Sequence, residues 1–306
     1  MSQTSADPWT TRRLLGWMVD AFTRKDLDSP RRLAEMLMAH VLGFGSNRLK
    51  LYMDPDRPAT PLERETLRDL VGRALNHEPV QYLVGEEWFF GLPFAVDRRV
   101  LIPRPATATI VEEVLQHARA SRGAASKGDG MLIADVCSGS GCIAVALLKN
   151  LPGARAVATE CSEGALEVAR ANAVRHGVLD RLDLLHGDLL EPLLDHPATR
   201  GAGAIDYLVS NPPYIPDDEW PAVAPNVKDH EPHLALRGGV DGLDFVRRLL
   251  AGGPALVKAG GLLLIEVADS RAAEARDLIA ATPGLGDARL LKDFEGLPRV
   301  VVARRT

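Results

Sequence analysis

Four consecutive residues, Asn211-Pro212-Pro213-Tyr214, are the part of the sequence best suited to do chemistry. They follow Ser210 and, before it, the hydrophobic run 206–209, which predicts a buried strand that ends abruptly. Each proline fixes its own φ and keeps the preceding residue out of the helical region, so a stiff extended corner is expected. Asn211 offers an amide acceptor and donor, Pro212 a carbonyl acceptor, and Tyr214 a flat ring. Two acceptors beside a flat face suit a planar –NH2 group on an sp2 carbon, as in adenine, cytosine or the side-chain amide of glutamine.

The same four residues would also make an ordinary turn, because Asn and Pro are common turn formers. Here they follow a core-like strand, whose carboxyl end is where ligands bind in open α/β sheets. They also lie downstream of a glycine loop typical of nucleotide sites. We therefore predict catalytic roles for Asn211, Pro212 and Tyr214, and substrate binding by these three residues together with Pro213.

The glycine loop is the segment 135–142, Asp-Val-Cys-Ser-Gly-Ser-Gly-Cys, between a predicted strand and a predicted helix. Gly139 permits a tight turn, and Gly141 lets a ligand approach the backbone. Ala144 completes a Gly-x-Gly-x-x-Ala pattern, which is a weak signal for a nucleotide when it stands alone. We predict that the loop contacts the cofactor through Cys137, Ser138, Gly139, Ser140 and Gly141.

Acidic residues follow the next two predicted strands. Glu160 ends the second strand, where a carboxylate can accept hydrogen bonds from both hydroxyls of a ribose. Asp188 follows the third strand and is expected beside the adenine. The predicted cofactor-binding residues therefore also include Glu160, Asp188, Leu189 and Asn211. This pattern indicates an adenosine-containing cofactor and does not choose between NAD and S-adenosylmethionine.

The residues 211–214 help to decide between NAD and S-adenosylmethionine. Hydride transfer needs a group that moves a proton, often His, Lys or Tyr, and only Tyr214 is a candidate after the later strands. Methyl transfer to nitrogen needs a sulfonium methyl, a lone pair aimed at it and good alignment, which Asn211 and the Pro212 carbonyl can supply. We favour an S-adenosylmethionine-dependent methyltransferase. An NAD-dependent oxidoreductase, a methyltransferase for base amines and a non-catalytic binding module remain as alternatives.

The composition of the chain limits the kinds of partner and compartment that we expect. The chain has 306 residues, 46% hydrophobic and 25% charged, as in an ordinary globular protein with room for two domains of ~150 residues. A formal net charge of −5 and the lack of a Lys/Arg run disfavour direct nucleic-acid binding. The 3 cysteines form no Cys-x-x-Cys motif, which indicates reduced cytoplasmic thiols and no metal site. Residues 1–9 lack the apolar core of a signal peptide, and no apolar stretch reaches the ~20 residues of a membrane span. We expect a cytoplasmic monomer.

Residues 1–78 are predicted to form a helical domain that recognises the substrate. Apolar residues recur at helical spacing over 9–77. Ser29-Pro30 and Thr60-Pro61 predict helix starts, and Glu63 completes a capping box with Thr60. His40 is expected on the buried face of its helix as a structural histidine.

Residues 79–105 are predicted to form a linking β-hairpin, with the stretch 82–84 among its extended segments. Arg104, between two prolines, suits a surface charge and a cleft group equally. From 106 to 306, predicted strands and helices alternate, which indicates a parallel sheet covered by helices and ended by an antiparallel pair. The strands are expected at 131–136, 154–159, 182–186, 207–210, 262–267, 288–291 and 299–303. The helices are expected at 107–120, 141–150, 162–176, 243–257 and 270–281, with a loop at 121–129.

These motifs also carry a resemblance. The segments 135–141 and 211–214, with Glu160, resemble S-adenosylmethionine methyltransferases that modify the side-chain nitrogen of glutamine. Nearly the whole chain is similar to the peptide chain release factor N5-glutamine methyltransferase family. The supporting stretches are 29–31, 78–83, 101–105, 231–236, 241–245 and 298–301. The resemblance implies a seven-stranded, Rossmann-like class I methyltransferase domain with an N-terminal helical bundle. It also implies S-adenosyl-L-methionine as methyl donor, S-adenosyl-L-homocysteine as product, and the glutamine of a Gly-Gly-Gln loop as substrate.

The sequence departs from the family pattern at a few positions. Cys137 stands where the family usually has Gly, Glu160 replaces the more usual Asp, and Ala106 and Ala108 stand where acids are usual. Cys137, with the stretches 88–91 and 230–232, resembles the sister enzyme that methylates ribosomal protein L3. The helical amino-terminal part and the stretch 293–296 resemble the release-factor enzyme more. We favour release factors as the substrate, with ribosomal protein L3 as the alternative.

Overall fold

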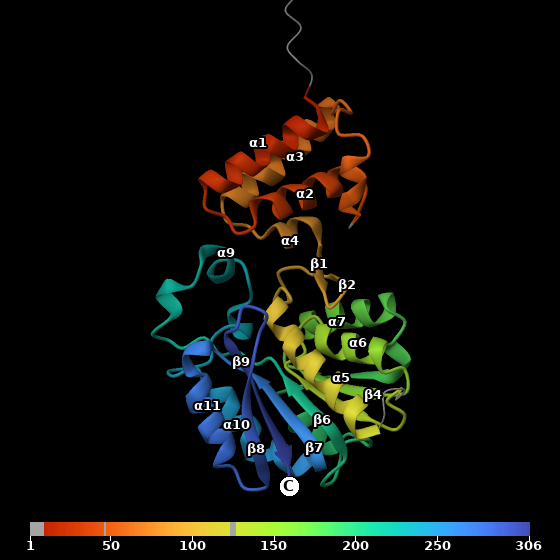
Figure 1. Ribbon diagram of the computed structural model, residues 1–306, viewed down its shortest axis with the longest axis vertical. Helices are drawn as coiled ribbons and strands as arrows, with labels where there is room; N and C mark the ends of the chain where they lie inside the picture. Colours follow the sequence, from red (N-terminus) through yellow and green to blue (C-terminus); the bar gives the residue numbers. More distant parts are fainter. Residues whose placement is uncertain (1–8, 46, 123–126) are drawn as a thin grey trace, which may run out of the picture. The chain divides into compact units, whose positions relative to one another are not determined.

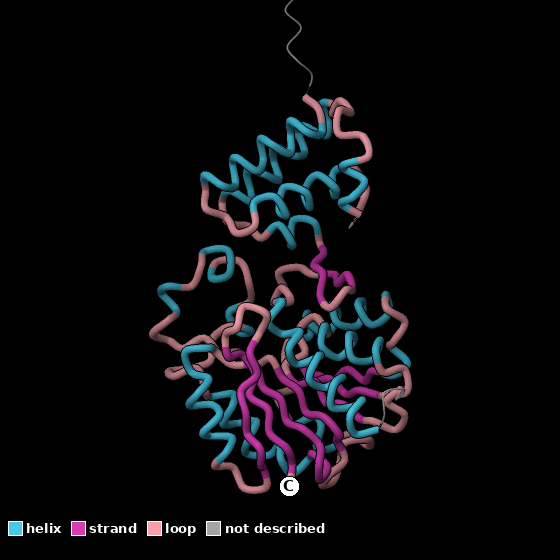
Figure 2. The backbone as a smooth tube through the Cα atoms, in the orientation of Figure 1, coloured by secondary structure: helices cyan, strands magenta, loops and turns pink. Residues whose placement is uncertain are grey.

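The computed structural model describes residues 9–45, 47–122 and 127–306. The chain divides into two compact units. The first takes the residues up to Glu86 together with Pro225–His230, and the second takes Glu87–Ala224 and Glu231–Thr306 (Figures 1 and 2). The expectation for residues 1–8, and that for the middle of the loop at 121–129, fall outside the described residues.

The first unit is helical, as its periodicity predicts. It contains α1 (Thr11–Arg24), α2 (Pro30–Val41) and α3 (Pro61–Leu75), with a 3-10 turn η1 (Arg48–Tyr52) and the short helix α4 (Val80–Val84). Each long helix turns an apolar stripe inward. The buried core includes Met18, Phe22, Leu37, Met38, Leu67 and Leu70.

The two predicted helix starts differ in detail. At α3, the Thr60 hydroxyl accepts the Glu63 N–H at 3.2 Å, and the Glu63 carboxylate accepts the Thr60 N–H at 2.8 Å, so the capping box is confirmed. Ser29 does precede α2, but its φ of 50° is left-handed and its side chain makes no capping bond. His40 is exposed, so its predicted place on the buried face is wrong. It lies two residues, about 200° around the helix, beyond the buried Met38.

The prediction that residues 82–84 are extended is also wrong, because they belong to α4. Pro79 precedes this single helical turn, and Gly85, at a φ of 74°, ends it. A helix of one turn is too short to show a helical period, and its β-branched and aromatic residues favour a strand.

The predicted hairpin follows α4. Its strands are β1 (Glu86–Phe89) and β2 (Leu92–Ala95), which form a 2-stranded sheet. Phe90 and Gly91 connect them with φ angles of 49° and 75°. Two left-handed residues in a two-residue connection suit the twist of a tight hairpin.

The second unit is built on a 7-stranded sheet with the order β5-β4-β3-β6-β7-β9-β8. The pairs from β5 through β7 are parallel, and β9 is antiparallel to both β7 and β8, as the alternation and the terminal pair predict. The strands are β3 (Leu132–Val136), β4 (Arg155–Glu160), β5 (Leu182–His186), β6 (Ile205–Ser210), β7 (Val257–Glu266), β8 (Leu285–Lys292) and β9 (Pro298–Arg305).

Helices cover both faces of this sheet (Figure 1). One layer contains α5 (Ala108–Arg122), α6 (Cys142–Asn150) and α7 (Glu163–Arg175). The other contains α8 (Glu191–Asp195), α10 (Asp244–Leu256) and α11 (Ala272–Ala280). The remaining short segments of this unit are η2 (Pro105–Thr107), η3 (Leu179–Arg181), η4 (Trp220–Ala222), η5 (His233–Ala235) and η6 (Asp269–Arg271), while α9 (Pro225–Lys228) belongs to the first unit.

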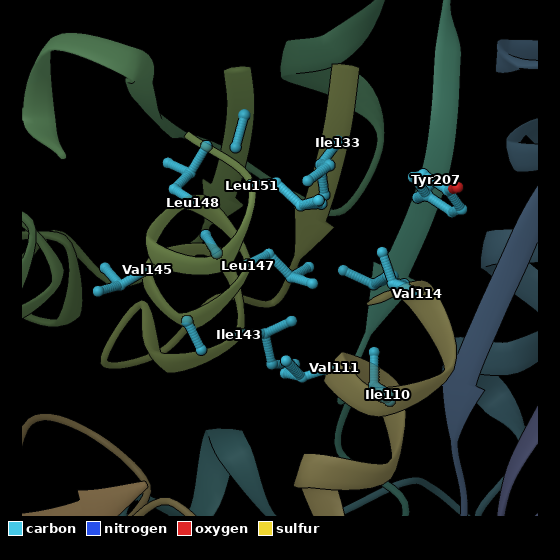
Figure 3. Packing of buried hydrophobic residues seen from close by; sticks show 14 of the residues in the cluster. Ile110, Val111, Val114, Ile133, Ile143, Val145, Leu147, Leu148, Leu151 and Tyr207 are labelled. Atoms are coloured by element: carbon cyan, nitrogen blue, oxygen red, sulfur yellow. The ribbon is translucent and has the colours of Figure 1, made fainter. Parts of the chain in front are cut away.

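Alternating strand residues fill the two layers. Ile133 of β3 packs with α5 and α6, whereas its neighbour Ala134 packs in the opposite layer. Figure 3 shows Val111 and Val114 of α5 directed toward side chains of α6 and β3. This packing fixes the strand ends from which the site is built.

Candidate functional site

A cavity of about 420 Å³ lies in the second unit, at the carboxyl ends of β3, β4, β5 and β6. The carboxyl ends of neighbouring parallel strands meet at one edge of a sheet, where the connecting loops leave room for a ligand. The structure brings most of the site residues predicted from sequence together there, without Gly141, Pro212 and Tyr214. Those that line the cavity are Cys137, Ser138, Gly139, Ser140, Glu160, Asp188, Leu189, Asn211 and Pro213.

The glycine loop turns sharply after β3. Gly139 and Gly141 have φ angles of 54° and 78°, and Cys137 shares this left-handed region at 63°. A Cβ added at Gly141 would lie 3.2 Å from the Cβ of Ala169, so this glycine lets the start of α6 pack closely against α7. Gly141 is absent from the cavity lining, so its structural part is that close packing.

Ser138 contributes the loop's free polar group. Its hydroxyl oxygen is buried without a hydrogen-bond partner among the described residues. A buried polar atom without a partner is costly, and a ligand that hydrogen bonds to it would remove that cost. Ser138 therefore marks the loop side of the cavity as a polar contact.

Glu160 is fixed at the end of β4 by two backbone groups. One carboxylate oxygen accepts the Gly139 N–H at 2.9 Å, and the other accepts the Ser162 N–H at 3.0 Å. The Oε1 that accepts from Ser162 also accepts the Cys161 thiol at 3.4 Å, so the further lone pair is on Oε2. The carboxylate thus ties the glycine loop to the start of α7 and still faces the cavity.

The loop that follows β5 supplies Asp188 and Leu189. Asp188 forms an ion pair with Arg248 of α10, which also lines the cavity. Leu189 is buried with a φ of 48°, and its carbonyl accepts the Thr159 hydroxyl at 2.7 Å. Arg248 was missed by sequence reasoning, because a charged residue on a predicted helix gives no sign of what it will meet.

Asp135 lies beneath the loop, fully buried and outside the cavity lining. One oxygen accepts the Ala144 N–H at 3.0 Å, and the other has no partner among the described residues. Burial raises the pKa of this carboxyl to about 7, against the opposing effect of the Ala144 hydrogen bond.

Asn211 is held by its nitrogen. The Asn211 Nδ2 donates to the Thr107 hydroxyl at 3.2 Å, whereas Oδ1 is buried without a partner among the described residues. Both residues line the cavity. The carbonyl of this amide is therefore a free acceptor at the site.

Pro212 and Tyr214, which were predicted beside Asn211, are not among the residues that line the cavity. The Tyr214 hydroxyl instead donates to Glu266 at the end of β7, at 3.3 Å. Burial raises the pKa of Tyr214. The structure therefore separates Tyr214 from Asn211 and Pro213, although the three are neighbours in sequence.

The segment 101–105 is anchored across one side of the cavity. Buried Glu231 accepts the Ile102 N–H at 3.0 Å and forms an ion pair with Arg104. Arg104 is thus engaged with a buried acid. Sequence reasoning left its position open because Glu231 lies 127 residues farther along the chain. Ala106 and Ala108, where the family usually has acids, do not line the cavity.

Within the described parts of the chain, no group of three or more His, Cys, Asp or Glu residues is arranged to hold a metal ion. Over the same residues, no helix combines the length and apolar character needed to cross a membrane.

Comparisons with known proteins place the chain. Residues 13–85 match the PrmC N-terminal domain family, and residues 123–230 match the methyltransferase small domain family. A release factor glutamine methyltransferase of Chlorobaculum tepidum is 40% identical over 291 residues, covering 95% of this chain and 96% of the relative. A release factor glutamine methyltransferase of Geobacter sulfurreducens is 40% identical over 296 residues, covering 97% of both chains.

A solved structure agrees with the fold. The hMettl16 catalytic domain in complex with MAT2A 3′UTR hairpin 6 has a TM-score of 0.52, with 14% identity over 71% of this chain and 76% of that chain. The 7-stranded sheet and the matched methyltransferase domain confirm the predicted class I methyltransferase fold. Given 40% identity over nearly its whole length, the chain belongs to the release factor glutamine methyltransferase family.

Proposed function

We propose that this protein transfers the methyl group of S-adenosyl-L-methionine to the side-chain amide nitrogen of the glutamine in the Gly-Gly-Gln loop of peptide chain release factors. The proposal rests on the family and on one observation, the buried and unpartnered Oδ1 of Asn211 at the cavity. Such an acceptor suits an amide N–H. The product bears on translation termination, and the donor leaves as S-adenosyl-L-homocysteine.

The residues present fit the donor. Ser138 offers an unpartnered hydroxyl to the methionine end, beside the backbone of Gly139. Glu160 would offer the remaining lone pair of its Oε2 to a ribose hydroxyl, and Asp188 and Leu189 would lie beside the adenine. When bound, the donor supplies a methyl group on a positively charged sulfur.

The substrate amide needs alignment more than acid–base help. Its two N–H groups are held by the Asn211 Oδ1 and, in our proposal, by the Pro212 carbonyl. With both hydrogens held, the nitrogen lone pair faces the sulfonium methyl. Asn211 and Pro212 would hold the amide so that its nitrogen could accept the donor's methyl group, and the nitrogen would release one proton to water. Held geometry of this kind can supply several orders of magnitude in rate.

The partner assignments follow from the same proposal. Release factors are the proposed protein substrate, and ribosomal protein L3 is the second candidate, kept because Cys137 is shared with the sister enzyme. Residues 1–78 are proposed to recognise the substrate and 79–105 to link them to the methyltransferase domain at 106–306. We also propose a cytoplasmic monomer, since the free cysteines Cys137, Cys142 and Cys161 suit a reducing compartment.

The test is methylation of purified release factor and purified ribosomal protein L3 with labelled S-adenosylmethionine, followed by peptide mapping. We expect label on the Gly-Gly-Gln glutamine of the release factor. Asn211→Ala should slow single-turnover methylation on the order of 10²-fold, while S-adenosylmethionine affinity changes little. Label on L3 alone would overturn the substrate assignment, and near-normal methylation by the variant would remove Asn211 from its role.

A further inference from the structure

Two residues of α10, Phe245 and Arg248, line the cavity. Residues three positions apart lie on the same side of a helix, so these two are neighbours along its surface. Arg247, one position away, is absent from the cavity lining and pairs instead with Asp241 and Asp244. One side of the start of α10 therefore faces the cavity.

Arg248 is held at this side by two contacts. Its guanidinium carbon lies 5.8 Å from the centroid of the Phe245 ring, within the range of a cation–π attraction. The same guanidinium forms an ion pair with Asp188, which also lines the cavity. A long side chain that is held at both a ring and a carboxylate has few orientations left. The two side chains of α10 thus form one surface at the cavity, the Phe245–Arg248 surface.

The ion pair of Arg248 is better suited to a ligand than to the stability of the fold. The side chains of Arg248 and Asp188 are 48% and 49% exposed, and such exposed pairs contribute little to stability. A ligand that covers the pair would exclude water and strengthen it, because charges attract more strongly in less polar surroundings. A guanidinium group is flat, weakly hydrated and stacks on aromatic faces. The Phe245–Arg248 surface therefore suits a flat aromatic ligand.

The strand register relates this surface to the ribose site. Glu160 pairs in register with His186 on the neighbouring β5, and Asp188 follows two residues later. A ribose held by Glu160 would therefore have Asp188 and its partner Arg248 close to the attached base. Adenine is a flat, uncharged ring system, and aromatic rings and guanidinium groups stack on such bases.

We propose that Phe245 and Arg248 bind the adenine ring of S-adenosylmethionine, with Asp188 as the residue that positions Arg248. This rests on the proposed function, which supplies the identity of the donor. The donor site then has a wall from α10 in addition to the loops that follow β3, β4 and β5.

The principal test is calorimetric titration of the whole protein with S-adenosyl-L-homocysteine, which carries the same adenine and needs no release factor. We expect Arg248→Ala to weaken binding by about 5- to 10-fold, the range of a cation–π contact that becomes desolvated. Arg248→Lys keeps the charge opposite Asp188 and loses the plane, so it should weaken binding by only about 2- to 3-fold. Phe245→Leu keeps the apolar bulk and removes the ring, and it should weaken binding by about 3-fold or more.

Arg247→Ala is the matched control. Arg247 is 47% exposed, against 48% for Arg248, and it also pairs with acids at the helix surface. It lies outside the cavity lining, so the affinity for S-adenosyl-L-homocysteine should stay within about 2-fold of wild type. An equal loss of affinity in Arg247→Ala and Arg248→Ala would trace the effect to damage at the start of α10 and overturn the proposal.

A kinetic measurement separates donor binding from damage to the reacting centre. In methylation of release factor, Arg248→Ala should raise the KM for S-adenosylmethionine by about 5-fold or more, and its single-turnover rate at saturating donor should stay within about 2-fold of wild type. A fall in that saturated rate as large as the loss of affinity would overturn the proposal.

Binding and methylation can fail separately. Wild-type affinity in both Arg248→Ala and Phe245→Leu would overturn the adenine site and leave the proposed function standing. If wild type binds S-adenosyl-L-homocysteine and does not methylate release factor, the proposed function fails, and the losses of affinity in the variants would still support the adenine site. If wild type binds no S-adenosyl-L-homocysteine, both fail. Phe245→Leu leaves the ion pair in place and decides the question if Arg248→Ala does not fold.

Discussion

Cys137 carries a backbone conformation that its side chain does not favour. Its φ of 63° is left-handed, a region that glycine adopts without cost and that costs other residues about 1–2 kcal/mol. This is the position where the sequence departs from the glycine usual in its family. The departure therefore has a local energetic consequence that can be measured.

We expect Cys137→Gly to be more stable than Cys137→Ala by about 1 kcal/mol, because both lose the thiol and only glycine releases the left-handed strain. Denaturant unfolding of the two variants would give the difference. Equal stabilities would show that the loop absorbs the strain elsewhere.

Glu160 gives a second prediction for a single residue. Glu160→Ala should weaken S-adenosylmethionine binding by about 1–3 kcal/mol, the scale of a lost charged hydrogen bond, measured by calorimetry. Glu160→Asp, the residue more usual in the family, should retain most of the affinity. Glu163→Ala is the control, because its side chain is 82% exposed at the start of α7. An equal loss of affinity in both alanine variants would show that Glu160 does not hold the ribose.

Asp135 predicts a pH dependence of stability. Its pKa rises from 3.8 to about 7 on folding, mainly through burial, so the folded state binds the proton more tightly. The contribution of Asp135 to the free energy of unfolding is fully present below its pKa in the unfolded state. It is lost as the pH rises from about 4 to about 7. Asp135→Asn should flatten the fall in the free energy of unfolding across this window. Glu266 contributes a similar fall, so part of the slope should persist in the variant. Unfolding curves at pH 4, 5, 6 and 7 with the same slope in both proteins would contradict this assignment.

At the scale of elements, Glu231 connects two loops. Its side chain is fully buried and accepts from Ile102 and Arg104, so the segment 101–105 is fastened to the connection that precedes η5. Pro103 and Leu234, one from each segment, both line the cavity. The anchor therefore stabilises the wall of the site and not only the fold.

Glu231→Ala should lower the free energy of unfolding by about 3 kcal/mol, the low end for a broken buried pair, because Arg104 is partly exposed and can be hydrated. Asp217→Ala is the matched control. Its pair with Arg237 lies at the surface and should contribute less than about 1 kcal/mol. Chemical denaturation of both variants checks this, and a loss in Glu231→Ala as small as the control's would contradict it.

The sequence predicted elements well where the hydrophobic period was sustained. The strands from β3 to β6 are short apolar runs bounded by turn residues, and each was placed within a few positions. The helix α4 was missed because one turn shows no period. Ser29 was placed correctly as the residue before α2, but its backbone angle, which decides whether it caps, is invisible in a sequence.

At the scale of the whole molecule, the alternation of predicted strands and helices was enough to predict the fold. It did not predict which polar side chains would meet. Asn211 and Thr107 are separated by 104 residues, and Arg248 and Asp188 by 60. The sequence located the acceptor, the glycine loop and Glu160 because each ends a recognisable strand. It gave no signal that Tyr214 would donate to Glu266, since that depends on which strands become neighbours.

The strand order also constrains the sequence of folding events. β8 lies at the edge of the sheet and pairs with β9, and β9 alone connects it to β7. The turn between β8 and β9 is local, with the Asp293 carboxylate accepting the N–H groups of Glu295 and Leu297 at 2.9 and 3.0 Å. Closing so short a loop costs little entropy, so the β8–β9 hairpin can form early and add to β7 as one piece. In the reverse direction, amide hydrogens of β8 should exchange with solvent at least as readily as those of β9, because β8 cannot remain on the sheet after β9 has left.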